Sequence, residues 1–258
     1  MSFSTEQLMA LLNAFMLPFV RISAFFMAAP FFGAATVPVR VRIILAIAVT
    51  VVLQPVIKTS GNLDVFSGLG LMHVIQQLLV GVALGSIFHF VLTAITMAGH
   101  NVATTMGLGF ASSADPQNGA EITVVGQIYV VLATLYFLSV DAHLRLLSII
   151  ASSMQTIPLQ QLVLNVHFFQ AIMGFSAQIF VFATLLVLPV IVGLLLVNLA
   201  VAVMTRAAPQ LNIFSLGFPL TILAGFLLMW LSLPVLTPLF GSFMDITLTF
   251  MSELAGGA

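Results

Sequence analysis

The run GHNVATTMGLGFASSADPQNGAE, residues 99–121, separates two long apolar halves of the chain. It contains four glycines and the turn-forming sequence DPQNG, a composition that interrupts helices. Main-chain amide and carbonyl groups outside a helix find no partner in lipid, so such a run survives at membrane depth only inside protein or along a watery cavity. Two roles are therefore open: a connection in solvent, or a constriction enclosed by protein.

Two features of residues 99–121 favour the enclosed role. The run is longer than most connections between helices. It also carries Met106, Leu108 and Phe110 among its glycines, and a solvated loop gains nothing by exposing apolar side chains to water. These residues alone leave both roles open.

The composition is that of an integral membrane protein. Of the 258 residues, 61% are hydrophobic and 5% are charged, whereas about a quarter of a soluble domain is charged. The mean hydropathy is +1.24. Residues 65–114 and 146–205 contain no charged side chain, and each interval is long enough to cross a bilayer. No Lys or Arg precedes Arg21, so we expect no cleaved signal peptide and a first helix that is retained.

Apolar segments of helical length predict an all-α, polytopic membrane fold of about six long helices in kinked hairpins. These helices are expected at residues 8–32, 41–57, 69–98, 122–140, 168–203 and 214–240. Residues 142–166 are apolar but carry scattered Ser, Gln and Pro, which predicts a hairpin packed on protein. Pro219, Pro234 and Pro238 are expected to break the last helix.

The expected organisation is a single integral membrane domain, residues 1–258. Its parts are N-terminal helices (1–98), the central loop (99–121), middle helices (122–203) and a C-terminal hairpin tip with the last helix (204–258).

Three residues of the first half are candidates for packing or contact. Arg21 lies inside an apolar segment, where a charged side chain snorkels, pairs internally, or faces a partner or cavity. Gly81 and Gly85 stand four apart in an apolar helix, and small residues at this spacing let helix backbones approach closely.

The composition disfavours catalysis, metal binding and nucleic-acid binding. Asp141 and His143 are two apart and point in different directions on a helix, so a shared metal is not expected. Ser242 lacks a nucleophile elbow. The chain has no cysteine for thiol chemistry and no basic run to bind phosphates. We expect no enzymatic activity, metal or cofactor.

A polar break between the last two apolar segments holds Arg206, Pro209, Gln210 and Asn212. One interpretation is a cytoplasmic loop that obeys the positive-inside rule. The other is a docking surface built from unwound helix ends.

In their order and spacing, these features resemble the flagellar biosynthetic protein FliR family and its relatives in virulence-type type III secretion. The residues that carry the resemblance are Arg21, Ala29-Pro30-Phe31-Phe32, Val37-Pro38-Val39-Arg40, Gly81, Gly85, Ala98-Gly99, Asp115-Pro116, Phe137-Leu138, His143, Ser153, Ile157-Pro158 and the hairpin tip 206–218. The sequence APQLN, residues 208–212, also looks like the tip of the small two-helix subunit of the same export gate.

The resemblance implies a fusion of two gate-subunit folds, P-like in front and Q-like behind. It implies a subunit of the flagellar export gate in the bacterial inner membrane, at the basal body, assembled with P-type and Q-type subunits and touching the B-type and A-type export components. Unfolded flagellar proteins would pass through the gate. The central loop would be its plug, through Met106, Gly107, Leu108, Gly109, Phe110, Asp115 and Pro116.

Two alternatives stay open at this point. One is the equivalent subunit of a virulence-type secretion system. The other is a self-contained transporter of a small solute, which predicts an inverted internal repeat with polar groups near the bilayer midplane. We find no clear repeat in the chain, and midplane polar residues are sparse.

Overall fold

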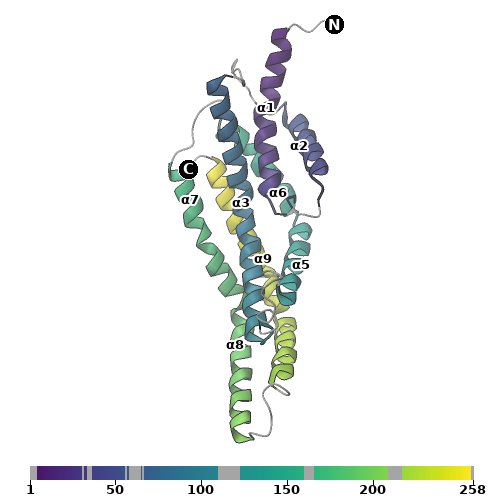
Figure 1. Ribbon diagram of the computed structural model, residues 1–258, viewed down its shortest axis with the longest axis vertical. Helices are drawn as coiled ribbons and strands as arrows, with labels where there is room; N and C mark the ends of the chain where they lie inside the picture. The colour runs from purple at the N-terminus through teal and green to yellow at the C-terminus, as the bar shows by residue number, and fades with distance from the viewer. Residues whose placement is uncertain are drawn as a thin grey trace. The chain divides into compact units, whose positions relative to one another are not determined.

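In the computed structural model, the described residues are almost all α-helical (Figure 1). It describes residues 5–30, 32–33, 37–55, 57, 65, 67–109, 123–159, 166–208 and 217–256. Its helices are α1 (Thr5–Ala28), α2 (Val39–Leu53), α3 (Gly68–Thr105), α5 (Val124–Ser139), α6 (Ala142–Thr156), α7 (Val166–Ser176), α8 (Gln178–Ala207) and α9 (Phe218–Gly256). The prediction of an all-α membrane fold is confirmed.

The number of membrane-spanning helices is smaller than the six predicted. In the described ranges, three helical stretches are long and apolar enough to cross a bilayer, or up to four if the broken pair α5–α6 counts as one span. The three are α3, the stretch Val166–Ala207 and α9. Helix α2 has 15 residues and rises only about 22 Å, less than the roughly 30 Å of a hydrocarbon core.

Three predicted helix breaks are wrong. Helix α3 continues through Gly99 as far as Thr105, and α9 continues through Pro234 and Pro238. Gly99 serves packing, because a Cβ built on it would collide with the Cα of Gly126 in α5. A proline inside an apolar helix removes one main-chain hydrogen bond, which membrane helices tolerate when the surrounding protein supplies other contacts.

The chain divides into two compact units. Unit 1 comprises Met1–Phe90, Asp141–Ala177 and Asp245–Ala258, and unit 2 comprises Val91–Val140 and Gln178–Met244. Within unit 1, α1 packs along the first part of α3, and the rings of Phe175 in α7 and Phe250 in α9 stack with centroids 4.2 Å apart.

Unit 2 is held by aromatic and glycine contacts between α3, α5, α8 and α9. The rings of Phe182 in α8 and Phe243 in α9 stack with centroids 4.3 Å apart. Tyr136 of α5 lies against Gly241 of α9, where an added Cβ would come within 2.5 Å of the tyrosine hydroxyl oxygen. These contacts position the helices of unit 2 that pack around the end of α3.

Candidate functional site

Helix α3 ends in a glycine-centred cap. Gly107 has a φ of +87°, in the left-handed region that favours glycine. The amide of Leu108 donates to the carbonyl oxygen of Ala103 at 3.0 Å, and the amide of Gly107 donates to that of Thr104 at 3.0 Å. This pair of bonds is the Schellman motif, which closes a helix by satisfying carbonyls of its last turn.

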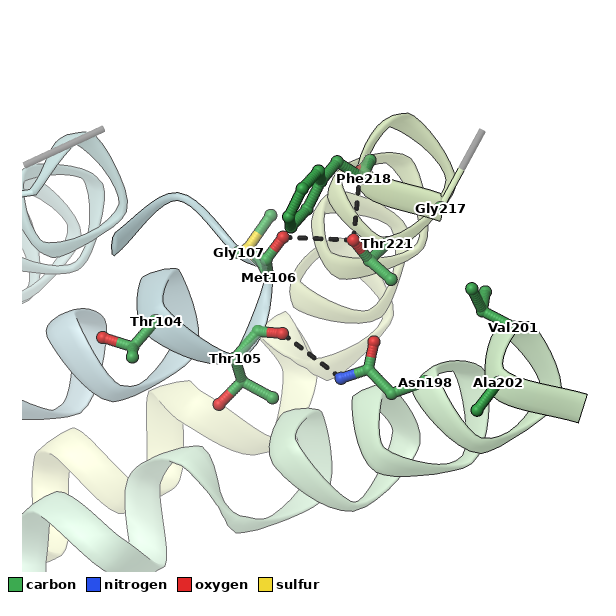
Figure 2. A pocket seen from close by; sticks show the side chains of 10 residues that line it. All are labelled: Thr104, Thr105, Met106, Gly107, Asn198, Val201, Ala202, Gly217, Phe218 and Thr221. Atoms are coloured by element: carbon green, nitrogen blue, oxygen red, sulfur yellow. Dashed lines mark hydrogen bonds between the residues drawn. The ribbon is translucent and has the colours of Figure 1, made fainter. Parts of the chain in front are cut away.

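Side chains from two other helices complete this cap (Figure 2). Asn198 Nδ2 of α8 donates to the carbonyl oxygen of Thr105 at 3.3 Å. Thr221 Oγ1 of α9 lies 3.1 Å from the carbonyl oxygen of Met106 and 3.0 Å from that of Phe218. The end of α3 is therefore fixed by α8 and α9 through its main chain.

Apolar contacts reinforce the same junction. Met106 is fully buried, and a Cβ added to Gly225 of α9 would lie 2.6 Å from its Cε. A Cβ added to Gly107 would lie 2.7 Å from Cδ1 of Phe218. Both glycines therefore leave space that a neighbouring side chain fills.

A pocket of about 260 Å³ opens between the end of α3, helix α8 and the start of α9. Its lining is apolar except for three threonines and Asn198. None of the residues that line it titrates, so this pocket offers no side-chain acid or base. Its chemistry is that of neutral hydrogen bonding next to apolar packing.

The structure brings together part of the predicted plug and two residues that sequence reasoning missed. Met106, Gly107, Leu108 and Gly109 lie at the end of α3, while Phe110, Asp115 and Pro116 fall outside the described residues. The missed residues are Asn198 and Thr221. Asn198 does leave a trace in the sequence, since it is the one amide between Gln178 and Arg206.

Arg21 forms a second polar centre, within unit 1. Its side chain is fully buried, and Nε donates to Oε1 of Gln77 at 2.7 Å. Nη1 donates to the carbonyl oxygen of Ser153 at 2.6 Å, and Nη2 donates to that of Ile157 at 2.8 Å. Gln77 in turn donates from Nε2 to the carbonyl oxygen of Leu159 at 3.1 Å. Internal pairing, one of the alternatives for this arginine, is confirmed.

Gly81 and Gly85 let α3 approach α1 closely, as their spacing predicts. A Cβ on Gly81 would collide with the main-chain oxygen of Arg21, and one on Gly85 would lie 2.7 Å from the Cβ of Ala28. Arg21 and both glycines are thus engaged inside unit 1. Their role in contacts between subunits stays a prediction.

Comparison with known proteins identifies the family. Residues 12–246 match the family model described as bacterial export proteins, family 1. The chain belongs to this export family. It is 35% identical over 255 residues to flagellar biosynthetic protein FliR of Escherichia coli K12, with 97% of each chain covered. It is 34% identical to the FliR proteins of Pectobacterium carotovorum and Bacillus subtilis, with 99% and 95% of each chain covered.

These relatives bear on the alternatives left open by the sequence. All three are flagellar, and this export-family chain is a subunit of the flagellar type III export gate. Together with its apolar helices, the relationship places it as a multi-pass protein of the inner membrane.

The remaining site residues of this export-family chain lie at the end of α8. Arg206 is exposed in the last turn of α8, where a positive charge is favourable at the negative end of the helix dipole. Pro209, Gln210 and Asn212 fall outside the described residues. In the ranges that the structure covers, no three His, Cys, Asp or Glu side chains group as a metal site would require.

Proposed function

We propose that the end of α3 is the fixed base of the gate's closure. Met106 to Gly109 are the part of the closing loop that the structure describes, and Phe110 to Pro116 are the part that follows in sequence. The supporting observation is the turn at Gly107, held by main-chain and side-chain hydrogen bonds from three helices. A closure needs such a base, because the loop must return to one position after each protein has passed.

Apolar side chains suit the closure of a protein-conducting channel. A ring of apolar groups excludes water and thereby stops ions. Its contacts with an unfolded chain are weak enough for the chain to pass through. Methionine and glycine add adaptability, since the methionine side chain is unbranched and glycine has few steric limits. The sequence MGLGF at residues 106–110 combines these properties.

The gate partners are proposed to be P-type and Q-type subunits, with the B-type and A-type export components beyond them. Membership of the flagellar export apparatus implies contact with other gate components. Large apolar side chains exposed on α8 support a cover of protein or lipid along that helix: Phe180, Leu188, Leu195, Leu196, Leu199 and Val203. The transported partners are unfolded flagellar proteins, moved by the proton motive force and an associated ATPase.

The test of the closure is ion leakage. Deleting residues 107–114 from the chain, and assembling the complete export complex in membranes, should raise ion conductance above that of the parent complex. Thr237→Val is the control, because it changes an exposed residue of α9 in the same unit and leaves residues 107–114 in place. Conductance equal to the parent in an assembled deletion complex would overturn the closure role.

A further inference from the structure

Four successive carbonyl groups end α3, and each has a different partner. The amide of Leu108 donates to the carbonyl oxygen of Ala103, and the amide of Gly107 donates to that of Thr104. The side chain of Asn198 donates to the carbonyl oxygen of Thr105, and the side chain of Thr221 donates to that of Met106. The last four carbonyls of a helix lack partners within it, so this end is completely satisfied only while α8 and α9 stay in contact with it.

We propose that Asn198 and Thr221 form a latch that holds the end of α3, and that breaking these two hydrogen bonds frees residues 107–109. This inference rests on the proposed closure role. Asn198 and Thr221 act as positioning residues, since they hold the base of the closure through main-chain carbonyls and form no part of the closing loop.

The hydroxyl group of Thr221 has a second acceptor within hydrogen-bonding distance. Its hydroxyl carries one proton, which it donates either to the carbonyl oxygen of Met106 or to that of Phe218, at 3.1 and 3.0 Å. When α3 moves away, the hydroxyl keeps a hydrogen bond by donating to Phe218. Releasing the latch therefore leaves no unpaired donor at Thr221.

The pocket allows Asn198, too, to change its hydrogen-bond partner. It borders Asn198, Thr105 and Met106 and has a volume of about 260 Å³. Water in the liquid occupies about 30 Å³ per molecule, so the pocket has room for water to replace the carbonyl of Thr105 as partner of the amide. A contact whose groups find new partners on release opens at small cost, which distinguishes a latch from a permanent structural bond.

A single introduced cysteine reports the position of the α3 end. The chain contains no cysteine, so Leu108→Cys gives one thiol, next to the cap and half-buried. The measurement is its rate of reaction with N-ethylmaleimide in the full chain, within the assembled export complex in membranes. Complexes are isolated through a tag on another subunit, so the rate refers only to assembled protein.

Removing the latch bonds should raise the labelling rate. We expect about a fivefold increase for Thr221→Val and for Asn198→Leu, and a larger one for both together, from the loss of one net hydrogen bond each. Thr221→Ser keeps the hydroxyl and should restore the parent rate. Thr237→Val is the control, because the exposed hydroxyl of Thr237 serves only its own helix, at the carbonyl of Leu233.

The outcomes separate the latch from the closure. An unchanged labelling rate in the assembled double variant overturns the latch, whatever the deletion of residues 107–114 does to conductance. Loss of assembly in both single variants, with normal assembly of Thr221→Ser, also counts against it, since a latch residue is not needed for assembly. Faster labelling in the double variant, together with parental conductance in the separate complex that lacks residues 107–114, supports the latch and removes the closure role.

Discussion

Nη1 of Arg21 donates a 2.6 Å hydrogen bond to the carbonyl oxygen of Ser153, 132 residues further along the chain. The same guanidinium reaches Ile157, just beyond the last residue of α6. Its positive charge thus lies at the C-terminal end of that helix, where the helix dipole is negative. Among the residues that the structure describes, no carboxylate pairs with Arg21. The buried charge is balanced by carbonyl groups and by Gln77.

Replacing Arg21 by Met should destabilise unit 1 strongly. The change leaves the carbonyl oxygen of Ile157 and the amide oxygen of Gln77 without this donor, and each unpaired buried acceptor costs about 1–3 kcal/mol. The carbonyl oxygen of Ser153 keeps the hydrogen bond from the amide of Ile157. We expect a loss of at least about 2 kcal/mol, measured by thermal unfolding of the purified chain in detergent. Arg145→Met is the matched control. The ion pair of Arg145 with Asp245 is exposed, and such pairs contribute at most about 1 kcal/mol. Equal losses for the two variants would contradict this account of Arg21.

Gly81→Ala should destabilise the packing of α1 on α3. The added methyl group would collide with the main chain of α1 at Arg21, and main chain cannot move aside as a side-chain end can. Overpacking of this kind costs about 1–3 kcal/mol. The control is Gly174→Ala in α7, in the same unit, where a Cβ meets nothing within 4 Å. There the gain in helix propensity should stabilise the chain by about 0.5–1 kcal/mol. We expect the melting temperature to fall for Gly81→Ala and to rise for Gly174→Ala.

Composition alone predicts which segments are helical, because long charge-free apolar runs have few other structures in a membrane protein. It does not predict where α3 ends, because glycine serves two purposes in the same run. Gly99 lets α3 touch Gly126, and Gly107 supplies the left-handed cap. Close packing and a left-handed cap both require a residue without a Cβ atom. The sequence therefore does not tell the two roles of glycine apart, and only the neighbouring residues in the structure do.

The polar contacts show a similar division. The cost of placing a charge in an apolar segment predicts that Arg21 has a partner or a cavity, and the structure shows that the partners are internal. The partners themselves do not follow, because they are mostly carbonyl groups, which every residue carries. Asn198 and Thr221 were missed for the same reason, since their acceptors are main-chain atoms that leave no mark in the sequence.

Gly107→Ala should weaken the cap of α3 for two separable reasons. A φ of +87° strains any residue with a Cβ, by about 1–2 kcal/mol, and the added methyl group would press on the ring of Phe218. Adding Phe218→Leu should relieve the contact but leave the strain. The measurement is thermal unfolding of the single and double variants. Gly109→Ala is the control, because its nearest neighbour would lie at 3.5 Å and it should change stability by less than about 0.5 kcal/mol. A double variant as stable as the parent would exclude backbone strain as a cause.

Arg206→Glu should weaken assembly of the gate. The substitution places a negative charge at the negative end of the α8 dipole and reverses the charge of the proposed docking tip. We expect a lower yield of complex on co-purification with the other gate subunits, together with reduced motility. Arg40→Glu, an exposed reversal at the start of α2, is the control for charge alone. Normal complex yield and normal motility for Arg206→Glu would remove the docking role of this tip.

The single tryptophan tests what covers α9. Trp230 is 66% exposed and lies beside exposed Leu227 and Leu231 on the same helix. In the isolated chain this exposed apolar surface should contact lipid, so brominated acyl chains in nanodiscs should quench the tryptophan fluorescence. If a gate subunit packs on this face, assembly should protect Trp230 and restore its emission. The fluorescence is read from complexes whose other subunits have their tryptophans replaced by Phe. Equal quenching before and after assembly would show that this face of α9 stays in lipid and that the partners bind elsewhere on the chain.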